Sequence, residues 1–276
     1  MLKALGSVLV AVVLSGCSIS VIDKKGLDAN ERESTASLGL SLRCAPDDLF
    51  ESALSVCGDL SGAGEIRVEG DLAVAGDLSH AGTFDVSGDL RRGHAAPCGA
   101  QGMNVAAAVA NARTDHDHEA ATVLDTGRYY FDDASFVGSN HIRVVGHASM
   151  FVDGDLDAVG ESSIFVEPGA SLDLYVAGSV HAVGSMVAAG CDPNALRVFV
   201  GGSDSIIAGA GDTELRGFLY APDAEVSLAG STTITGAVVA KEISFAGSLH
   251  VKGIPQAKRP SSACGRIVAD PSVSPN

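Results

Sequence analysis

The sequence predicts an all-β protein, a right-handed parallel β-helix (a β-solenoid), with short helices at 47–57 and 103–113. The first observation behind this prediction is an unbroken glycine spacing of six residues, at Gly58, Gly64, Gly70, Gly76, Gly82 and Gly88. The second is that apolar residues fall two and often four positions after these glycines, as Ile66 and Val68 do. Alternation with period two indicates strands with one buried face, and regularly spaced glycines supply the corners between them. Such strands stack coil upon coil, with neighbouring strands about 4.8 Å apart.

The composition supports a folded domain and excludes some function classes. The chain has 276 residues, of which 46% are hydrophobic, enough for a substantial core. Its 33 glycines and its lack of tryptophan are unlike a helical enzyme, because each glycine weakens a helix interior by about 1 kcal/mol relative to alanine. The formal net charge is −16 and no dense run of Lys or Arg occurs, so we expect no nucleic-acid partner.

The N-terminus predicts export. An apolar run from Leu5 to Leu14 follows Lys3 and is shorter than the roughly 20 residues that span a bilayer, so 1–16 is interpreted as a signal peptide. Its end, Leu14-Ser15-Gly16-Cys17, resembles the bacterial lipobox, in which the cysteine thiol is diacylated before cleavage. The resemblance implies a membrane anchor at Cys17 and a place in the cell envelope. In lipoproteins of this type, a residue other than Asp after the cysteine, here Ser18, implies the outer membrane.

The segment that follows the anchor is expected to be a flexible tether, over 17–43, because it mixes charged and small polar residues without an apolar period. Five cysteines remain beyond Cys17, an odd number in a compartment that permits disulfides. Within the hexad-repeat section 44–100, Asp47 to Val56 has the pattern of a short amphipathic helix. Cys57 continues the apolar face of that helix, so Cys44 and Cys57 are the first candidates for a disulfide.

A second glycine-punctuated block is predicted to form the main β-helix, at 126–254, with an antiparallel sandwich as the alternative fold. Between the blocks, the insertion 101–125 contains Met103 to Arg113, which is alanine-rich and free of Gly and Pro. We expect this helix to cover one end of the solenoid, since an open end exposes unpaired strand edges. The tail 255–276 carries four prolines and is expected to be extended.

Three segments of the second block resemble a known family: Phe151–Leu156, Leu172–Gly178 and above all Gly217–Gly230 with its Tyr-Ala-Pro stretch. The family is an uncharacterised group of β-helix domains found in bacterial surface lipoproteins and in proteins associated with type IV pilus assembly. The similarity covers about 95–251, and Gly127–Phe131 fits the segment that opens their helix. Where the family often ends in His-Tyr-Asp, this chain has His250-Val251-Lys252.

The hexads at 58–90 separately resemble the bactofilins, which are polymer-forming β-helical proteins. Together the resemblances imply fold and location rather than chemistry. The partners they imply are envelope or pilus proteins, or further copies of the chain.

Few residue groups suggest a site. The sequence has no GxSxG, HExxH, phosphate loop or dinucleotide fingerprint. A polar run at 115–119 (DHDHE) could offer imidazole and carboxylate, but a solvated loop or helix end is favoured because adjacent helical residues point in different directions. Asp153, Asp155 and Asp157 have strand spacing, which would place three carboxylates on one outer face as a candidate Ca²⁺ site. A plain charged face is the favoured interpretation of these three.

The last candidate is Tyr129-Tyr130-Phe131 beside Asp132 and Asp133, because aromatic faces and paired carboxylates are what a glycan-cleaving β-helix uses. Alternation buries at least one of these aromatic residues, which favours core packing. Hexapeptide acyltransferases are a further alternative, an enzyme class built on a similar repeat. In their repeats, however, the small residue directly follows the buried aliphatic one. His80, the candidate base of such an enzyme, is expected to be an exposed strand residue.

The sequence therefore favours a non-enzymatic, lipid-anchored envelope protein with a structural or interaction role and no cofactor. A carbohydrate-binding or carbohydrate-cleaving β-helix is the alternative.

Overall fold

The computed structural model describes residues 13–15, 18–20, 49–93, 95, 98, 103–119, 121–190, 192–203 and 206–254. Cys17, Cys44, the tail 255–276 and nearly all of the expected signal peptide and tether lie outside the described residues. Near the N-terminus, β1 (Val13–Ser15) and β2 (Ser18–Ser20) pair as a short antiparallel hairpin. No helix among the described residues is long and apolar enough to span a bilayer.

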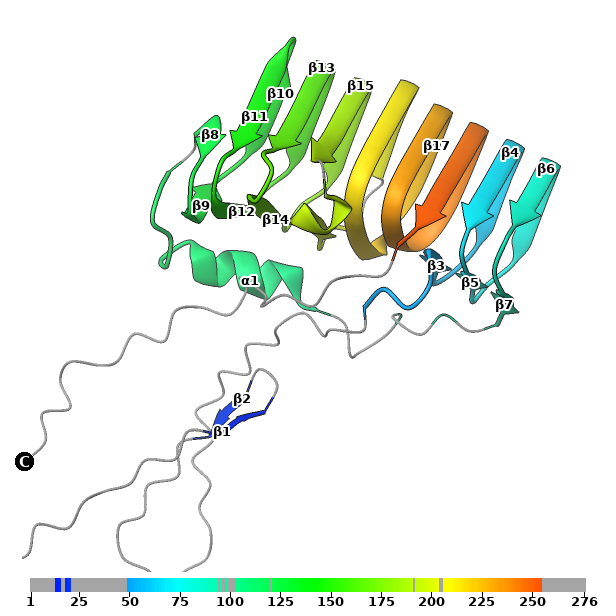
Figure 1. The fold of residues 1–276 in the computed structure, drawn as a ribbon, viewed down its shortest axis with the longest axis horizontal. Coiled ribbons are helices and arrows are strands. Elements are labelled where there is room, and N and C mark those ends of the chain that lie inside the picture. The colour runs from blue at the N-terminus through cyan, green and yellow to red at the C-terminus, as the bar shows by residue number, and fades with distance from the viewer. Residues whose placement is uncertain are drawn as a thin grey trace, which may run out of the picture.

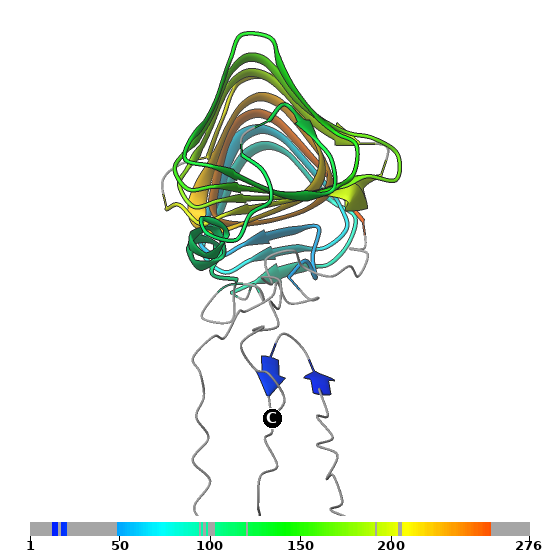
Figure 2. The same ribbon diagram turned by 90° about the vertical axis from the view of Figure 1, so that its left-hand side faces the viewer.

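The remaining strands form one parallel β-solenoid, which confirms the predicted fold class (Figure 1). Viewed along its axis, the solenoid has a triangular outline (Figure 2). The strands of the hexad section are β3 (Leu54–Val56), β4 (Leu60–Glu69), β5 (Leu72–Val74), β6 (Leu78–Val86) and β7 (Leu90–Arg92). The second block contributes β8 (Val123–Leu124), β9 (Gly127–Phe131), β10 (Ala134–Val137), β11 (Asn140–Val144), β12 (His147–Val152), β13 (Leu156–Val166), β14 (Ser171–Val176), β15 (Val180–Gly190), β16 (Leu196–Val200) and β17 (Ile206–Gly253).

The coils do not stack in the order of the sequence. The hexad section follows the C-terminal end of β17, because Val238–Ala240 pairs with β3 and Ile243–Lys252 pairs with β4. Figure 1 shows this junction as the cyan strands beside the orange ones. The hexad coils, which come first in the sequence, thus form one end of the rod. The second block begins at the other end, with β8 and β9. The two blocks form a single solenoid.

Glycine and aspartate work together at one set of corners. Asp59 projects toward the next coil, where its Oδ1 accepts the N–H of Asp77 at 2.8 Å. Gly76 precedes Asp77, and a Cβ on Gly76 would lie 2.2 Å from that Asp59 oxygen. The glycine is therefore needed because the carboxylate of the preceding coil occupies the space of a side chain. The same arrangement recurs with Asp71 beneath Gly88, Asp133 beneath Gly154 and Asp155 beneath Gly178.

A second corner is formed by a column of glycines at positive φ, in the order Gly230, Gly247, Gly64 and Gly82. Gly64 has φ +128°, and a Cβ there would lie 1.9 Å from the carbonyl oxygen of Gly247. Backbone stacks directly on backbone at this corner, so neither the conformation nor the space admits a side chain.

The solenoid has two apolar layers. Inside the coils, aliphatic residues such as Leu54, Leu72 and Leu172 form a continuous core with no exposed surface. Outside the face made by β9, β12, β14 and β16, a ladder of aromatic side chains packs under α1 (Val105–Ala112). The rings of Phe151, Tyr175 and Phe199 stack with centroids 4.9 Å apart. These stacked rings build one continuous surface for the helix.

The helix predicted at 103–113 exists as α1, capped by Asn104, but it lies along the side of the rod instead of over its end (Figure 2). Residues 117–119 and 121–124 instead cover the edges of β9 and β11 at that end, while β10 pairs with β13 alone among the described strands. There the backbone N–H groups of Asp117 and His118 donate to the carbonyl oxygen of Arg128, and the N–H of Arg143 donates to the carbonyl oxygen of Thr122. A short 3-10 turn, η1 (Pro193–Ala195), leads into β16.

The helix predicted at 47–57 is wrong, because 49–53 is irregular and Leu54–Val56 is strand β3. Leu54 and Val56 fill the inner column of the solenoid while Leu49 packs in the layer under α1, so tertiary contacts override the helical pattern. The predicted Cys44–Cys57 disulfide is also wrong. Cys57 is bonded to Cys98, 41 residues away.

Gly64→Ala should lower the free energy of unfolding by ~3 kcal/mol or more, because the methyl group collides with the Gly247 carbonyl. The matched control is Gly169→Ala, at φ +84° but with nothing within 4 Å of its Cβ, which should cost only about 1–2 kcal/mol of backbone strain. Denaturant unfolding of both variants measures the difference. Equal losses would contradict the close stacking.

Candidate functional site

The aromatic residues singled out for glycan binding are buried. Tyr129, Tyr130 and Phe131 are 4%, 6% and 7% exposed. Tyr129 and Phe131 point into the core of the solenoid, whereas Tyr130 joins the layer under α1. These residues therefore offer no open ring face on which a sugar could stack.

Two arginines are buried on the same helix-covered face. Arg197 donates from Nε to Oδ1 of Asp173 at 2.8 Å, a second contact joins its Nη2 to Oδ2, and both side chains are almost fully buried. Arg128 lies with its guanidinium 4.7 Å from the centre of the Phe151 ring. Because these charges are paired or stacked between neighbouring strands, we assign them to holding the coils together.

The polar run 115–119 fastens the end of α1 to the first coil. His116 contacts Oε1 of Glu119 through Nε2 at 3.1 Å and the carbonyl of Ala112 through Nδ1 at 2.9 Å. The hydrogen bond to Glu119 is the main reason that the pKa of His116 lies above its usual value. Asp117 accepts the N–H of Arg128 at 3.0 Å. Among the described residues, no group of three His, Cys, Asp or Glu side chains could hold a metal ion.

The candidate Ca²⁺ ligands do not share one strand face, so that prediction is wrong. β12 ends at Val152 and β13 begins at Leu156, so a corner separates Asp153 from Asp157. Asp153 accepts the hydroxyl of Tyr130 at 2.9 Å and pairs with Arg113. Asp155 caps the N–H of Ser179 at 2.8 Å. Asp153 and Asp155 are thus each bound to different structural partners.

The hydrogen bond that the Arg113 guanidinium donates to the Asp153 carboxylate is the main reason that the pKa of Asp153 lies below its usual value. Arg113 also donates to the Tyr130 hydroxyl at 3.2 Å. Arg113 therefore ties the C-terminal end of α1 to the first coil by a hydrogen bond to Tyr130 and to the second coil by an ion pair with Asp153.

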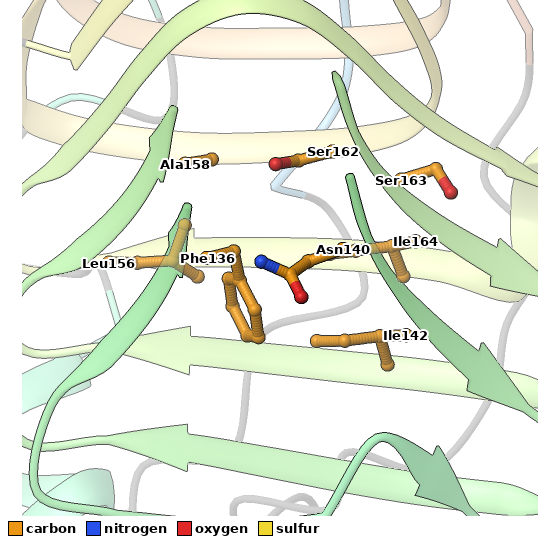
Figure 3. A pocket seen from close by; sticks show the side chains of 8 residues that line it. All are labelled: Phe136, Asn140, Ile142, Leu156, Ala158, Ser162, Ser163 and Ile164. Carbon is orange, nitrogen blue, oxygen red and sulfur yellow. The ribbon is translucent and has the colours of Figure 1, made fainter. Parts of the chain in front are cut away.

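A hollow between the coils is too small for a substrate. It lies at the corner between β10 and β11 and has a volume of about 20 Å³, room for about one water molecule (Figure 3). It is lined by Phe136, Asn140, Ile142, Leu156, Ala158, Ser162, Ser163 and Ile164.

An outer face of short side chains, here called the serine–alanine face, runs over β17, β4 and β6, with the Glu225 carboxylate at its border. Its outward residues are Ser227, Ala229, Ser244, Ala246, Ser61, Ala63, Ser79 and Ala81. The register places Ser61 between Ser244 and Ser79, and the hydroxyls of Ser227 and Ser244 are 2.9 Å apart. Hydroxyl and methyl groups therefore repeat about 4.8 Å apart across the coils and about 6.6 Å apart along each strand.

This face was missed by the sequence reasoning, although a signal for it exists. A motif of an acidic residue, an aliphatic residue, Ser, any residue, Ala and Gly occurs four times, at 59–64, 77–82, 225–230 and 242–247. Alternation makes the aliphatic residue point inward and Ser and Ala point outward in each copy.

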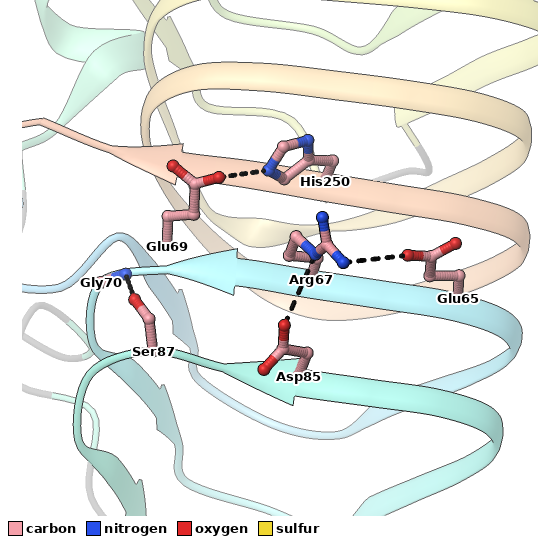
Figure 4. A network of polar contacts seen from close by, with 7 residues as sticks. All are labelled: Glu65, Arg67, Glu69, Gly70, Asp85, Ser87 and His250. Atoms are coloured by element: carbon pink, nitrogen blue, oxygen red, sulfur yellow. Dashed lines mark hydrogen bonds and ion pairs between the residues drawn. The ribbon is translucent and has the colours of Figure 1, made fainter.

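The neighbouring outer face is charged instead. Arg67 lies 3.8 Å from Glu65 and 3.5 Å from Asp85, and His250 lies 3.1 Å from Glu69 (Figure 4). The pairs of Arg67 with Asp85 and of His250 with Glu69 link successive coils, but these exposed contacts contribute little to stability, because water screens them.

Comparison with known proteins identifies a family for most of the solenoid. A family profile described as "Domain of unknown function (DUF7305)" matches residues 85–253. No curated protein matches the chain.

Three similar solved structures are ice-binding proteins. One, from the Antarctic ascomycete Antarctomyces psychrotrophicus, is 16% identical over 75% of this chain and 97% of that one, with a TM-score of 0.42. One from an Antarctic biological consortium is 12% identical over 74% and 87%, with a TM-score of 0.46. A glycosylated one from an Arctic yeast is 18% identical over 83% and 99%, with a TM-score of 0.44. Similarity at this level does not extend to what those proteins bind.

Arg113→Gln should make stability less dependent on acid pH. Because the pKa of Asp153 is lowered in the folded state, its ion pair stabilises the protein above the unfolded pKa of about 3.9, and this stabilisation is lost as pH falls through the folded pKa. The variant should be less stable than the wild type at neutral pH, and the two should converge in acid.

Thermal unfolding from neutral pH to below pH ~4 measures this convergence. Arg143→Gln, which removes an exposed pair with Glu167, is the control and should change stability by less than ~1 kcal/mol. A constant gap between Arg113→Gln and the wild type at all pH values would contradict the assignment.

Proposed function

This chain belongs to the family described as "Domain of unknown function (DUF7305)", whose profile matches residues 85–253, and because that description gives no function we propose one from the residues of the chain itself. The protein is a lipid-anchored component of the bacterial cell envelope, and its β-solenoid serves a non-enzymatic structural or interaction role.

The single observation that carries this proposal is the sequence Leu14-Ser15-Gly16-Cys17 after an apolar run. Diacylation of Cys17 attaches the chain to a membrane, because each buried methylene contributes ~0.8 kcal/mol and two or more acyl chains make attachment stable. The segment 17–43 is long and polar enough to hold a folded domain away from the bilayer surface. Ser18 supports the outer membrane as the destination.

The arrangement of polar groups supports an interaction role over catalysis. The carboxylates of Asp59, Asp71, Asp133 and Asp155 cap backbone N–H groups, and Asp153 is paired with Arg113. The serine–alanine face is open, regular and made of short side chains, which lose little conformational entropy when a partner covers them. The carbohydrate alternative loses its main support, since the aromatic residues at 129–131 are buried.

Radioactive palmitate labelling tests the anchor. The wild type should carry label and sediment with the envelope, whereas Cys17→Ala should lose the label and become soluble. Cys264→Ala is the matched control and should behave like the wild type. Ser18→Asp should retain the label but move the protein from the outer to the inner membrane on a density gradient. An unlabelled, freely soluble wild type would overturn the proposal and reopen the secreted-protein alternative.

A further inference from the structure

The two ends of the rod differ in how they are finished. At the β9 end, the edges of β9 and β11 are covered, because the carbonyl of Arg128 accepts the N–H groups of Asp117 and His118 and the carbonyl of Thr122 accepts that of Arg143, whereas β10 pairs with β13 alone among the described strands. At the other end, β6 pairs with β4 alone among the described strands (Figure 1). The chain therefore covers the edges of β9 and β11 at one end, whereas at the other end the whole length of β6 is left as an open edge among the described strands.

The β6 end has the structure of an interior coil that lacks its neighbour. In the coil before it, Leu60, Ile66 and Val68 are at most 1% exposed. Their counterparts Leu78, Phe84 and Val86 point the same way but are only half-buried. Leu90 on β7 is 39% exposed. Apolar surface that the preceding coil buries is thus left open here.

His80 adds to the unfinished character of this end. It was expected to be an exposed strand residue, but it points into the solenoid and stacks on Phe245, with ring centroids 5.7 Å apart. Its Nε2 atom is buried and has no hydrogen-bond partner in the described part of the chain. Among the described residues, the carboxylates of Asp77 and Asp89 likewise have no following coil to cap, unlike those of Asp59 and Asp71.

The β6 edge lacks the features that prevent strands from pairing with other molecules. Edge strands are ordinarily protected by lysine, proline, a bulge or a covering segment. Over its nine residues, β6 carries no lysine or proline, and its one charged residue is Asp85. Its pairing with β4 runs without a bulge from Leu78 to Val86.

The pattern along β6 is symmetric about its centre. Gly82 is the middle residue of β6. The order of half-buried and exposed side chains is the same whether the strand is read from its first residue or from its last. Inward residues lie two and four positions on each side of the glycine, at Leu78, His80, Phe84 and Val86. A strand with this symmetry is complementary to a second copy of itself that runs antiparallel, with the twofold axis at Gly82.

The backbone groups agree with this arrangement. The carbonyl of Asp77 and the N–H of Ser87 are both directed at the preceding coil. Because backbone groups alternate sides along a strand, those of Leu78, His80, Phe84 and Val86 face the open edge. In the antiparallel arrangement these are the residues that would exchange hydrogen bonds with the second copy.

We infer that two copies of this chain pair end to end through antiparallel β6 edges, forming a closed dimer with a continuous core. His80 meets Phe84 of the second copy, and Leu78 meets Val86 of the second copy, so inward residues meet inward residues. On the outer side of β6, Ala81 lies opposite Thr83 and Ser79 opposite Asp85, so the β6 pairing itself places no like charges together. The pairing goes beyond the proposed function and needs neither the anchor nor export.

Head-to-tail growth is disfavoured by the opposite end. The first coil has Asp132 where the next coil has Gly154, as the hydrogen bond from Gly154 to the Asp132 carbonyl shows. A stacked β6 end would bring Asp77 against Asp132 and Asp133, with a side chain in place of the required glycine and like charges together. The interface therefore closes after two copies.

The mass of the soluble Cys17→Ala chain, measured by light scattering across a concentration series, tests the pairing. The dimer predicts twice the monomer mass. Ala81→Lys/Thr83→Lys should halve it, because lysines at these positions face each other across the twofold axis. Ala81→Glu/Thr83→Glu should also be monomeric, and mixing the two variants should restore the double mass. Ala63→Lys/Glu65→Lys, one coil inside, is the matched control and should remain dimeric.

A wild type that stays monomeric at every concentration would overturn the inference. A dimer that the charge variants leave intact would place the interface elsewhere and also overturn it. Particles larger than a dimer that the same variants abolish would show open, head-to-tail stacking instead of the closed pair.

Discussion

Neighbouring coils approach so closely at their corners that backbone stacks on backbone. At Gly64 the space of a Cβ is taken by the Gly247 carbonyl, and at Gly76 it is taken by the carboxylate of Asp59. This approach keeps the strands within hydrogen-bonding distance and aligns the inner residues into one core. The glycines and the aspartates that cap the next coil thus form one structural arrangement. The carboxylates of these aspartates bind backbone N–H groups and so are not free to form a site.

The sequence was sufficient for the parallel solenoid and for the helix at 103–113, because both follow from local periodicity. It was not sufficient for the order of the coils. Ile243, Leu60 and Leu78 are interchangeable as inner residues, so nothing in the repeat indicates that the first coils stack on the last ones. The Cys57–Cys98 disulfide joins residues 41 positions apart and could not be derived from spacing alone. The segment 47–57 shows the same limit, since its apolar residues suit a helix locally but fill two layers of the solenoid.

The candidate site was harder to predict for a related reason. Asp153, Asp155 and Asp157 have the spacing of one strand face, and only the corner between β12 and β13 separates them. Tyr129 and Tyr130 alternate as expected, but the outward one is covered by α1. What stays open is the serine–alanine face and the β6 end, and both arise from the stacking of segments that are distant in sequence. These features support a rod that contacts other molecules through its surface rather than through a cleft.

The order of the coils is the central claim, and cysteine cross-linking tests it most directly. Ala63 lies opposite Ala246 in the register of β4 on β17, so Ala63→Cys/Ala246→Cys should form an intramolecular disulfide on mild oxidation. Had the coils stacked in sequence order, the last hexad coil would lie against the first coil of the second block, and Ala81→Cys/Val137→Cys would cross-link instead. The account predicts the first disulfide and not the second, and the reverse result would contradict it.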